Sequence, residues 1–373
     1  MGFLTNTIQR RTNMAKDTLS KLDRFVSGFA DRSFSVGIDV HKKRYHIALR
    51  RHDGKTLTWV SPAMPDKVSE QFARLPITID AVAYEAGPTG FGLARTLSRE
   101  GFSVIVAAPS RIPRTSTSGA KTDRLDCERL AEYASMGLLK PIAVPTEEEE
   151  AQRGLVRRRH QLVDGIRRVK QRIKGLLLFL GLEEPAGLSG WTEPARSKLE
   201  DLEIPQAARW TLDSYMMELN CLEGNLEVVR GQLAELTQAD NHRDAISCLR
   251  SVPGVGPVVA ATFRFEVFSP ERFGRAEELA SYLGLAPMVR QSGEGKARGR
   301  LRPVGQKRLK SLLVEAAWMW KAKDAWARRQ YGRILSRVGL AQKAIMALAR
   351  KLAIILWRLC IERRKYHPGL ATT

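Results

Sequence analysis

The stretch "FSVGIDVHKKRYHIAL", residues 34–49, decides how the first part of this chain folds. Two apolar runs rich in β-branched and aromatic residues flank a short polar break, which is typical of two successive strands. Asp39 lies within the first run. Because aspartate is disfavoured in strands and burying an unpaired carboxylate is unfavourable, Asp39 needs a cation, a hydrogen-bonding loop or a place at a sheet end.

The segments that follow extend these two strands into a sheet with helices. We expect a strand in residues 55–62, a helix in 66–75, a strand in 78–86, a helix in 90–101, a strand in 102–109 and a helix in 121–137. Three leading strands followed by alternating helices and strands require an antiparallel meander that feeds a parallel sheet. This order predicts an α/β domain with the ribonuclease H-like (RuvC-like) fold over residues 34–145, after an N-terminal extension, residues 1–33.

Four carboxylates of this domain are candidate catalytic metal ligands. Glu85 ends the apolar run of the fourth strand, and Asp123 and Asp126 lie three residues apart on one helix face. Together with Asp39 they can converge at one edge of the sheet, where their repulsion favours divalent metal ions with oxygen ligands, such as Mg²⁺. Two such ions can hold the attacking and leaving oxygens of a phosphodiester.

Each of these carboxylates also has a plainer explanation. Asp39 could begin a turn, and Glu85 could be a solvated strand end. Asp123 could be the N-cap of its helix, with Asp126 as a first-turn acid that complements the helix dipole. The joint occurrence of all four, on this order of elements, favours the metal site.

A linker with "PTEEEE", residues 145–150, precedes two heptad seams. Apolar residues recur at spacings of three and four in residues 155–180 and again in 212–236, while glycines and prolines interrupt the region between. We therefore expect an antiparallel helical hairpin over residues 146–240, within one chain or between protomers. The first arm is strongly basic, which indicates nucleic-acid binding, although a solvated charged face explains part of it; the candidate contacts are Arg157, Arg158, Arg167, Arg168, Lys170 and Lys174.

The last segment, residues 241–373, opens with "LRSVPGVGPVVAATF", residues 249–263. This is a helix-hairpin-helix pattern, in which Gly254 and Gly256 let backbone amides approach a phosphate at the N-terminus of the second helix. A plain tight turn between two helices is the alternative. We expect the C-terminal region to be mainly helical.

The loop "VRQSGEGKARGRLR", residues 289–302, is basic and glycine-rich and carries a single serine, Ser292. A free serine hydroxyl is a poor nucleophile without a base or a metal, and none is adjacent in sequence. The surrounding cations suit a phosphate and its transition-state charge; they are Arg290, Lys296, Arg298, Arg300 and Arg302. A serine without a catalytic role, in a flexible polar loop, is the plainer explanation.

The overall composition limits the class of partner. Lysine and arginine number 61 against 40 acidic residues, a net charge of +21, which favours a polyanionic partner. The four cysteines are far apart with no CxxC pair, so neither a zinc site nor a disulfide scaffold is indicated. No signal-peptide pattern opens the chain, and charges interrupt the apolar stretch 343–360, so we expect a cytoplasmic protein with no membrane span.

Several motifs together resemble the DEDD transposases of the insertion-sequence one-ten family, the bridge-RNA-guided recombinases. They are "GIDVHKK", "YEAGPTG", "KTDRLDCERLA", "VPGVG", "YLGLAP", the "QSG" turn and "LRPVGQKRLKSLLVEAA", in the family's order from about residue 34 to 360. The family usually carries a Gly-Asn pair where this chain has Gly305 and Gln306, followed by Lys307 and Arg308, which we include among the candidate nucleic-acid contacts. Residues 1–33 have no counterpart in the family pattern.

The resemblance implies an RNA-guided DNA recombinase that excises and inserts its own element in the bacterial nucleoid. It places the metal-binding tetrad on Asp39, Glu85, Asp123 and Asp126, with two Mg²⁺ ions, and a serine nucleophile on Ser292. It implies DNA and a structured non-coding bridge RNA as partners. Strand exchange between two duplexes, together with the heptad seams, favours a homodimer or homotetramer. The alternatives are a RuvC-like structure-selective nuclease that uses water as nucleophile, and a non-catalytic nucleic-acid-binding protein.

Overall fold

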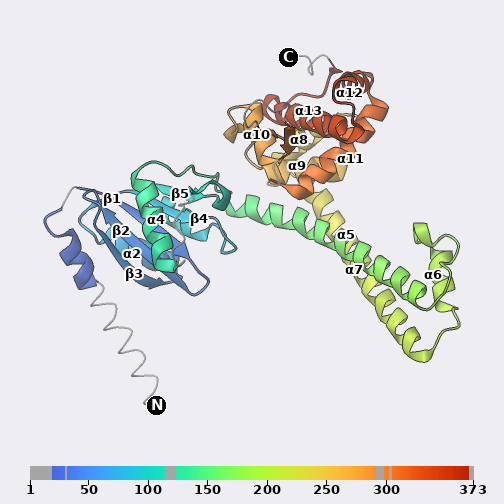
Figure 1. Cartoon of the computed structure of the whole chain (residues 1–373), viewed down its shortest axis with the longest axis horizontal. Helices are drawn as coiled ribbons and strands as arrows, with labels where there is room; N and C mark the ends of the chain where they lie inside the picture. The colour runs from blue at the N-terminus through green and yellow to red at the C-terminus, as the bar shows by residue number, and fades with distance from the viewer. Residues whose placement is uncertain (1–18, 30–31, 114–121, 291–297, 302–304, 369–373) are drawn as a thin grey trace. The chain divides into compact units, whose positions relative to one another are not determined.

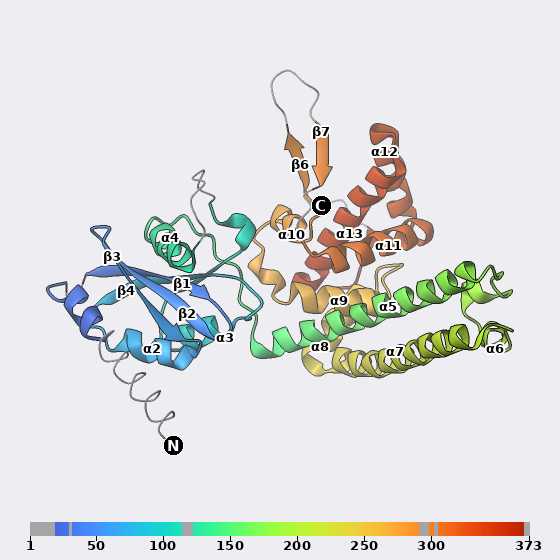
Figure 2. The same ribbon diagram turned by 60° about the horizontal axis from the view of Figure 1, so that its bottom comes forward.

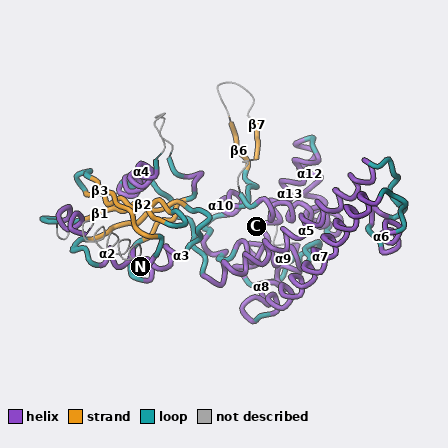
Figure 3. Tube along the Cα trace, turned by 90° about the horizontal axis from the view of Figure 1, so that it is seen from below, coloured by secondary structure: helices purple, strands orange, loops and turns teal. Residues whose placement is uncertain are grey.

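The computed structural model describes residues 19–29, 32–113, 122–290, 298–301 and 305–368. The chain forms two compact units, residues 1–146 and 147–373, which are described separately. The N-terminal unit contains the larger sheet, whereas the C-terminal unit is almost entirely helical (Figure 3).

The N-terminal unit is built on a five-stranded sheet in the order β3-β2-β1-β4-β5. The first three strands form an antiparallel meander, and β4 and β5 run parallel to β1. The strands are β1 (Ser33–Val40), β2 (Arg44–Arg51), β3 (Thr56–Pro62), β4 (Thr78–Glu85) and β5 (Val104–Ala107). With the helices α2 (Pro65–Ala73), α3 (Gly92–Arg99) and α4 (Asp123–Ser135) the element order is βββαβαβα. The predicted ribonuclease H-like fold is therefore confirmed.

Alternation along β1 divides the residues between the two faces of the sheet. Phe34, Val36 and Ile38 pack with α2 and α3 in the main apolar core of the unit. The helix over residues 19–26 adds Leu22 and Val26 to the same core, so part of the predicted extension packs with the sheet. The opposite face is covered by α4 (Figure 2).

Small residues on the α4 face let this helix lie very close to the sheet. Ala48 of β2, and Ala81 and Ala83 of β4, pack against Cys127, Leu130 and neighbouring residues of α4. A Cβ built on Gly37 of β1 would lie 2.1 Å from the carbonyl oxygen of Cys127 and 2.4 Å from the nitrogen of Ala131. Only glycine fits at this position.

The C-terminal unit begins with a long antiparallel hairpin of α5 (Glu147–Phe179) and α7 (Gln206–Gln238), joined through η2 (Leu188–Gly190) and the short helix α6 (Glu193–Glu200) (Figure 1). The two predicted seams face each other within one chain, and the hairpin core includes Leu162, Ile166, Val169, Ile173, Leu212, Leu219, Leu226 and Leu233. The apolar residues of both seams are thus buried against each other without a second protomer, so they give no support to the predicted dimer or tetramer.

Six further helices pack into one core beyond the hairpin. They are α8 (Asp240–Arg250), α9 (Pro257–Val267), α10 (Ala276–Tyr282), α11 (Lys307–Lys323), α12 (Ala325–Val338) and α13 (Ala341–Glu362), with the turn η3 (Pro270–Arg272). Ten residues of α13 are buried, so the apolar stretch near the C-terminus is a helix packed into this core. A two-stranded hairpin of β6 (Pro287–Arg290) and β7 (Arg298–Leu301) lies between α10 and α11.

Candidate active site

Asp39 lies at the carboxyl end of β1, on the face of the sheet that α4 covers. It follows Gly37 by two residues and therefore points to the same face. Since Gly37 allows α4 to rest on β1, the first turn of α4 is brought over Asp39. The Asp39 side chain keeps 23% of its surface exposed, so the carboxylate is not buried in the core.

Two histidines lie against these carboxylates: His41 contacts both Asp39 and Asp123, the first residue of α4, and His46 contacts Asp123. His41 Nε2 lies 2.9 Å from Asp39 Oδ2 and 3.6 Å from Asp123 Oδ2. His46 Nε2 lies 3.5 Å from Asp123 Oδ2, and the two imidazole rings meet edge to face with centroids 5.9 Å apart. Ligand atoms of Asp39, His41 and Asp123 all lie within 4.8 Å of one another, as required of groups that share one metal ion.

The local sequence explains how these side chains meet. Asp39 of β1 is directly opposite His46 of β2 in the antiparallel register. The turn between the strands is closed by the His41 amide, which donates to the Arg44 carbonyl oxygen at 3.1 Å. Thr122 is the N-cap of α4, and its hydroxyl accepts from the amide of Leu125. The alternative explanation of Asp123 as the N-cap is therefore wrong.

Glu85 and Asp126 lie near this group but outside its closest contacts. Glu85 ends β4, which is parallel to β1, and is exposed on the α4 face two residues after Ala83. Asp126 lies one turn along α4, 28% exposed, with an oxygen 4.0 Å from Arg129 Nη1. The structure thus brings Asp39 and Asp123 together and leaves Glu85 and Asp126 at the same end of the sheet.

His41 and His46 are site residues that sequence reasoning missed. The signal was present in "DVHKKRYH", where one histidine follows Asp39 by two residues and another is the third residue of the facing strand. Only the register between β1 and β2 shows that both imidazoles reach the carboxylates.

Cys127 lies behind the carboxylates, buried between α4 and the sheet. Burial raises the pKa of its thiol to about 12, and the negative charges of Glu128 and Asp39 add to the effect. The thiol is therefore protonated at neutral pH and is no candidate nucleophile.

Several of the predicted basic contacts have ion-pair partners on the hairpin. Lys170 pairs with Glu223, and Lys174 with Glu184. Arg167 and Arg168 both contact Asp164, while Arg158 is exposed. These pairs agree with the alternative of a partly solvated charged face, and nucleic-acid binding by these residues stays a prediction.

Arg157 has a different position, at the junction of α5 with α9. Its Nε and Nη2 donate to the carboxylate of Glu266 at 2.8 and 2.9 Å. Glu266 is only 1% exposed, so this pair explains Arg157 without a nucleic acid.

The predicted helix-hairpin-helix turn joins α8 to α9. Gly254 has a φ of +91°, and a Cβ there would lie 2.7 Å from the nitrogen of Trp320 in α11. Gly256 is the N-cap of α9, with Pro257 as first residue. The turn thus packs tightly on α11, as the plainer explanation expects, and also begins a helix whose N-terminus can attract a phosphate.

Ser292 and Lys296 lie outside the described residues, in the connection between β6 and β7. In the antiparallel register of these strands Arg290 is opposite Arg298, and Arg300 is also in β7. At the base of the two-stranded hairpin, where the chain leaves α10 and enters α11, Gln306 Nε2 donates to the Tyr282 hydroxyl at 3.2 Å and that hydroxyl donates to the Glu266 carbonyl at 2.8 Å.

Lys307 and Arg308 begin α11, just beyond this base. The charge of Arg308 reaches His160 of α5. Burial lowers the pKa of His160, and the positive charges of Arg308 and Arg159 lower it further. Positive groups of α5 and α11 are thus close neighbours.

A ribonuclease H-like sheet with carboxylates where β1 ends and α4 begins defines a class of metal-dependent nucleic-acid-processing enzymes. Family comparisons identify the member. Residues 36–181 match the DEDD transposase domain of IS110 elements, and residues 246–332 match the transposase domain of the IS116/IS110/IS902 family. The chain belongs to the IS116/IS110/IS902 family of transposases.

Similarity to individual relatives extends over nearly the whole chain. "Putative transposase y4qE" of Sinorhizobium fredii is 30% identical, with 90% of each chain covered. The transposase for insertion sequence element IS1533 of Leptospira borgpetersenii is 28% identical, over 86% of this chain and 96% of the relative.

The protein is therefore a transposase, an enzyme of DNA recombination whose substrate is DNA. This excludes the alternative of a non-catalytic nucleic-acid-binding protein. The DEDD domain indicates use of a divalent metal, in agreement with the group formed by Asp39, His41 and Asp123. Every helix in the described part of the chain is too short or too polar to cross a membrane.

Proposed function

We propose that this transposase excises and inserts its own element by RNA-guided DNA recombination, with an acidic metal site and a covalent serine intermediate. The observation that carries the proposal is the convergence of Asp39 and Asp123 at the end of β1, with ligand atoms of both within 4.8 Å of His41 Nε2. We divide the chain into a catalytic domain with the metal site, residues 34–145, a coiled-coil hairpin, residues 146–240, and a transposase domain that carries the serine, residues 241–373.

The residues of this site fit Mg²⁺. Hard divalent cations take carboxylate oxygens and retain several water molecules, so a partly open site with two carboxylates suits them. The Asp39 and Asp123 side chains are 23% and 54% exposed, which leaves room for water and for a phosphate. Glu85 and Asp126, at the same end of the sheet, would complete a site for two ions.

The steps of strand cleavage can be assigned to residues of this chain. A bound divalent ion supplies Lewis-acid stabilisation of charge on the phosphate oxygens. Ser292 Oγ forms an ester bond to phosphorus, one deoxyribose oxygen leaves, and the serine proton passes to that oxygen. The positive residues Arg290, Lys296, Arg298 and Arg300 hold the phosphate charge. Because the ester conserves the phosphodiester bond energy, a second DNA hydroxyl can displace the serine and rejoin the strand.

RNA guidance and self-association complete the proposal. A bridge RNA rests on the resemblance to the family and on the net charge of +21. A homodimer or homotetramer rests on the chemistry, because exchange between two duplexes needs more than one active site. Trp210 and Met217, one heptad apart on α7, are 66% and 73% exposed, and we assign them to this protein interface.

An excision assay tests this function in bacteria that carry the gene with its native flanking DNA. Circular junctions are sequenced for the wild type, Asp39→Ala and Ser292→Ala, with and without the flanking non-coding segment. We expect junctions only in the wild type with its flanks. Junctions from Ser292→Ala would exclude the serine intermediate and favour the nuclease with water as nucleophile, and junctions without the flanking segment would exclude RNA guidance.

A further inference from the structure

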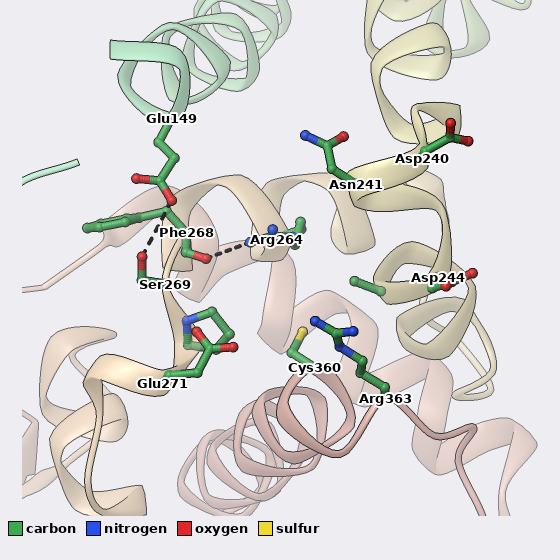
Figure 4. Close-up of a pocket in the computed structure, with 12 residues that line it drawn as sticks. Glu149, Asp240, Asn241, Asp244, Arg264, Phe268, Ser269, Glu271, Cys360 and Arg363 are labelled. Atoms are coloured by element: carbon green, nitrogen blue, oxygen red, sulfur yellow. Dashed lines mark hydrogen bonds between the residues drawn. The ribbon is translucent and has the colours of Figure 1, made fainter. Parts of the chain in front are cut away.

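The pockets of the C-terminal unit differ in charge. One, of about 280 Å³, lies between α8, the end of α9 and the end of α13, and four carboxylates line it: Glu149, Asp240, Asp244 and Glu271 (Figure 4). Arg264 and Arg363 are the basic residues of this lining. With carboxylates in the majority, this pocket does not suit a phosphate.

A groove along the hairpin has the opposite character. Three adjoining hollows lie along the hairpin, one at the start of α9, one in the middle and one beside Trp191. The hollow at α9 and the middle hollow share Arg230. The middle hollow and the one beside Trp191 share Val163, Ile166 and Lys170. We call this continuous surface the hairpin groove. It runs from the start of α9, at Pro257 and Val258, along α5 and α7 to Trp191 near the tip.

Arg159 and Arg230 are the cations of the α9 end of the groove. They come from opposite arms of the hairpin, and no carboxylate lines the hollow that they share. The Nε of Arg159 is buried and has no hydrogen-bond partner in the described part of the chain. Burial lowers the pKa of Arg159, and the charge of Arg230 lowers it further, so these two cations repel each other; the charge of Glu315 opposes the shift without cancelling it. An anion placed between them would relieve this repulsion.

The groove as a whole combines cations with an apolar floor. Its lining contains five cationic side chains, Arg159, Arg167, Lys170, Lys174 and Arg230, against two acids, Glu223 and Glu227. Glu223 is bound by Lys170 and Arg196, and Glu227 by Arg230. Arg167 and Lys174 contact Asp164 and Glu184, which lie outside the lining, so Arg159 is the cation of the groove for which the structure gives no ion pair in the described part of the chain. The exposed part of the floor is Val163, beside the edges of the buried core residues Ile166, Leu226 and Leu233. The centroid of the Trp191 ring at the far end lies 5.1 Å from Lys170 Nζ.

We propose that the hairpin groove binds a single-stranded nucleic-acid segment, with Arg159 and Arg230 as its phosphate anchor. Single strands expose their bases, which can contact an apolar floor and stack on a tryptophan while basic side chains hold the backbone. A duplex keeps its bases stacked inside and would leave the floor without a partner. The inference deepens the proposed function, on which it rests, by locating a binding track outside the catalytic domain.

The test compares two charge-matched double variants of the full chain. Arg159→Gln/Arg230→Gln removes the anchor, whereas Arg243→Gln/Arg329→Gln removes two exposed arginines of α8 and α12. Fluorescence anisotropy is measured in EDTA with a single-stranded RNA, a single-stranded DNA and a duplex DNA of equal length, over a range of salt concentrations. EDTA removes divalent ions, so the result does not depend on the chemistry of Asp39 or Ser292.

Loss of the anchor should reduce the salt slope of single-strand binding by about 1.4, because each phosphate contact contributes about 0.7. The control variant should retain the wild-type slope. A larger loss for RNA than for DNA would identify RNA as the preferred strand, and the reverse would identify DNA. Equal slopes for anchor and control variants, or a loss confined to the duplex, would overturn the proposal. If the double variant unfolds, Arg230→Gln alone, at a half-exposed position, should still reduce the slope by about 0.7.

Discussion

At the residue scale, Gly37 determines how closely α4 approaches the sheet. In Gly37→Ala the new Cβ would overlap backbone atoms of Cys127 and Ala131, at 2.1 and 2.4 Å, so α4 must move. We expect a loss of about 3 kcal/mol in the free energy of unfolding, as for other overpacked cores. Urea unfolding followed by circular dichroism measures it.

The matched control is Gly92→Ala at the start of α3, where a Cβ would meet nothing within 4 Å. This variant should stay within about 0.5 kcal/mol of the wild type. Equal stability of the two variants would show that α4 does not rest on Gly37 and that the placement of Asp123 over Asp39 needs another explanation.

Asp53 gives the N-terminal unit a specific response to acid. The hydrogen bond from Arg51 lowers the pKa of Asp53 from 3.8 to about 2, and the amide of Lys55 adds to the shift. Because the pKa is lower in the folded state, the pair stabilises the fold above about pH 4, and this contribution is lost as the pH falls towards about 2. Arg51 also covers the ring of Phe29, with 3.8 Å to its centroid.

We therefore expect Asp53→Asn to be less stable than the wild type at neutral pH, with the difference disappearing as the pH falls towards about 2. Thermal melting over this pH range measures the difference, with Asp66→Asn on the exposed side of α2 as control. A difference that does not change with pH would contradict the assigned cause.

Single residues also show how far the sequence alone could identify the site. Asp39 is conspicuous because a carboxylate inside an apolar strand requires an explanation, and the end of β1 provides it. His41 and His46 could not be assigned, because histidines occur in many solvated turns and only the strand register brings these two to Asp123. The close approach at Gly37 was equally hidden, since it depends on the path of α4.

At the element scale, a buried ion pair joins the hairpin to the helices that follow it. Arg153 and Arg157 of α5 both contact Glu266 of α9, which is 1% exposed. Glu266→Ala would leave two partly buried guanidinium groups without their carboxylate, and we expect it to lower the free energy of unfolding by about 3–5 kcal/mol. Chemical denaturation of the full chain measures this loss.

The matched control, Glu218→Ala, removes the partner of Arg172 from an exposed pair across the hairpin. It should lower the free energy of unfolding by less than about 1 kcal/mol. Similar losses in both variants would show that the junction of α5 with α9 is held by apolar packing alone.

Helices and strands could be predicted from the sequence where they depend on local periodicity. The heptad spacing predicts α5 and α7, and the strand order predicts the ribonuclease H-like sheet; both are present. Periodicity does not specify a partner, however, and the seams close within one chain. The position of Arg157 could not be foreseen for a similar reason, because Glu266 is more than a hundred residues away in sequence.

At the scale of the whole molecule, the two units carry different parts of the proposed chemistry. Asp39 and Asp123 belong to the N-terminal unit, whereas Ser292 belongs to the sequence of the C-terminal unit. The serine can take part in strand cleavage only if it and the acidic group act on the same phosphate. The covalent intermediate is thus the claim on which the account depends.

Trapping this intermediate tests the claim most directly. A nicked suicide DNA substrate, from which the cleaved strand diffuses away, is incubated with the wild type, Asp39→Ala and Ser292→Ala in the presence of Mg²⁺ and the flanking RNA. Denaturing electrophoresis detects a protein–DNA adduct, and mass spectrometry of nuclease-treated peptides identifies the modified residue. We predict an adduct only in the wild type, with the phosphate on Ser292. Strand cleavage by the wild type without an adduct, or an adduct that persists in Ser292→Ala, would contradict the account.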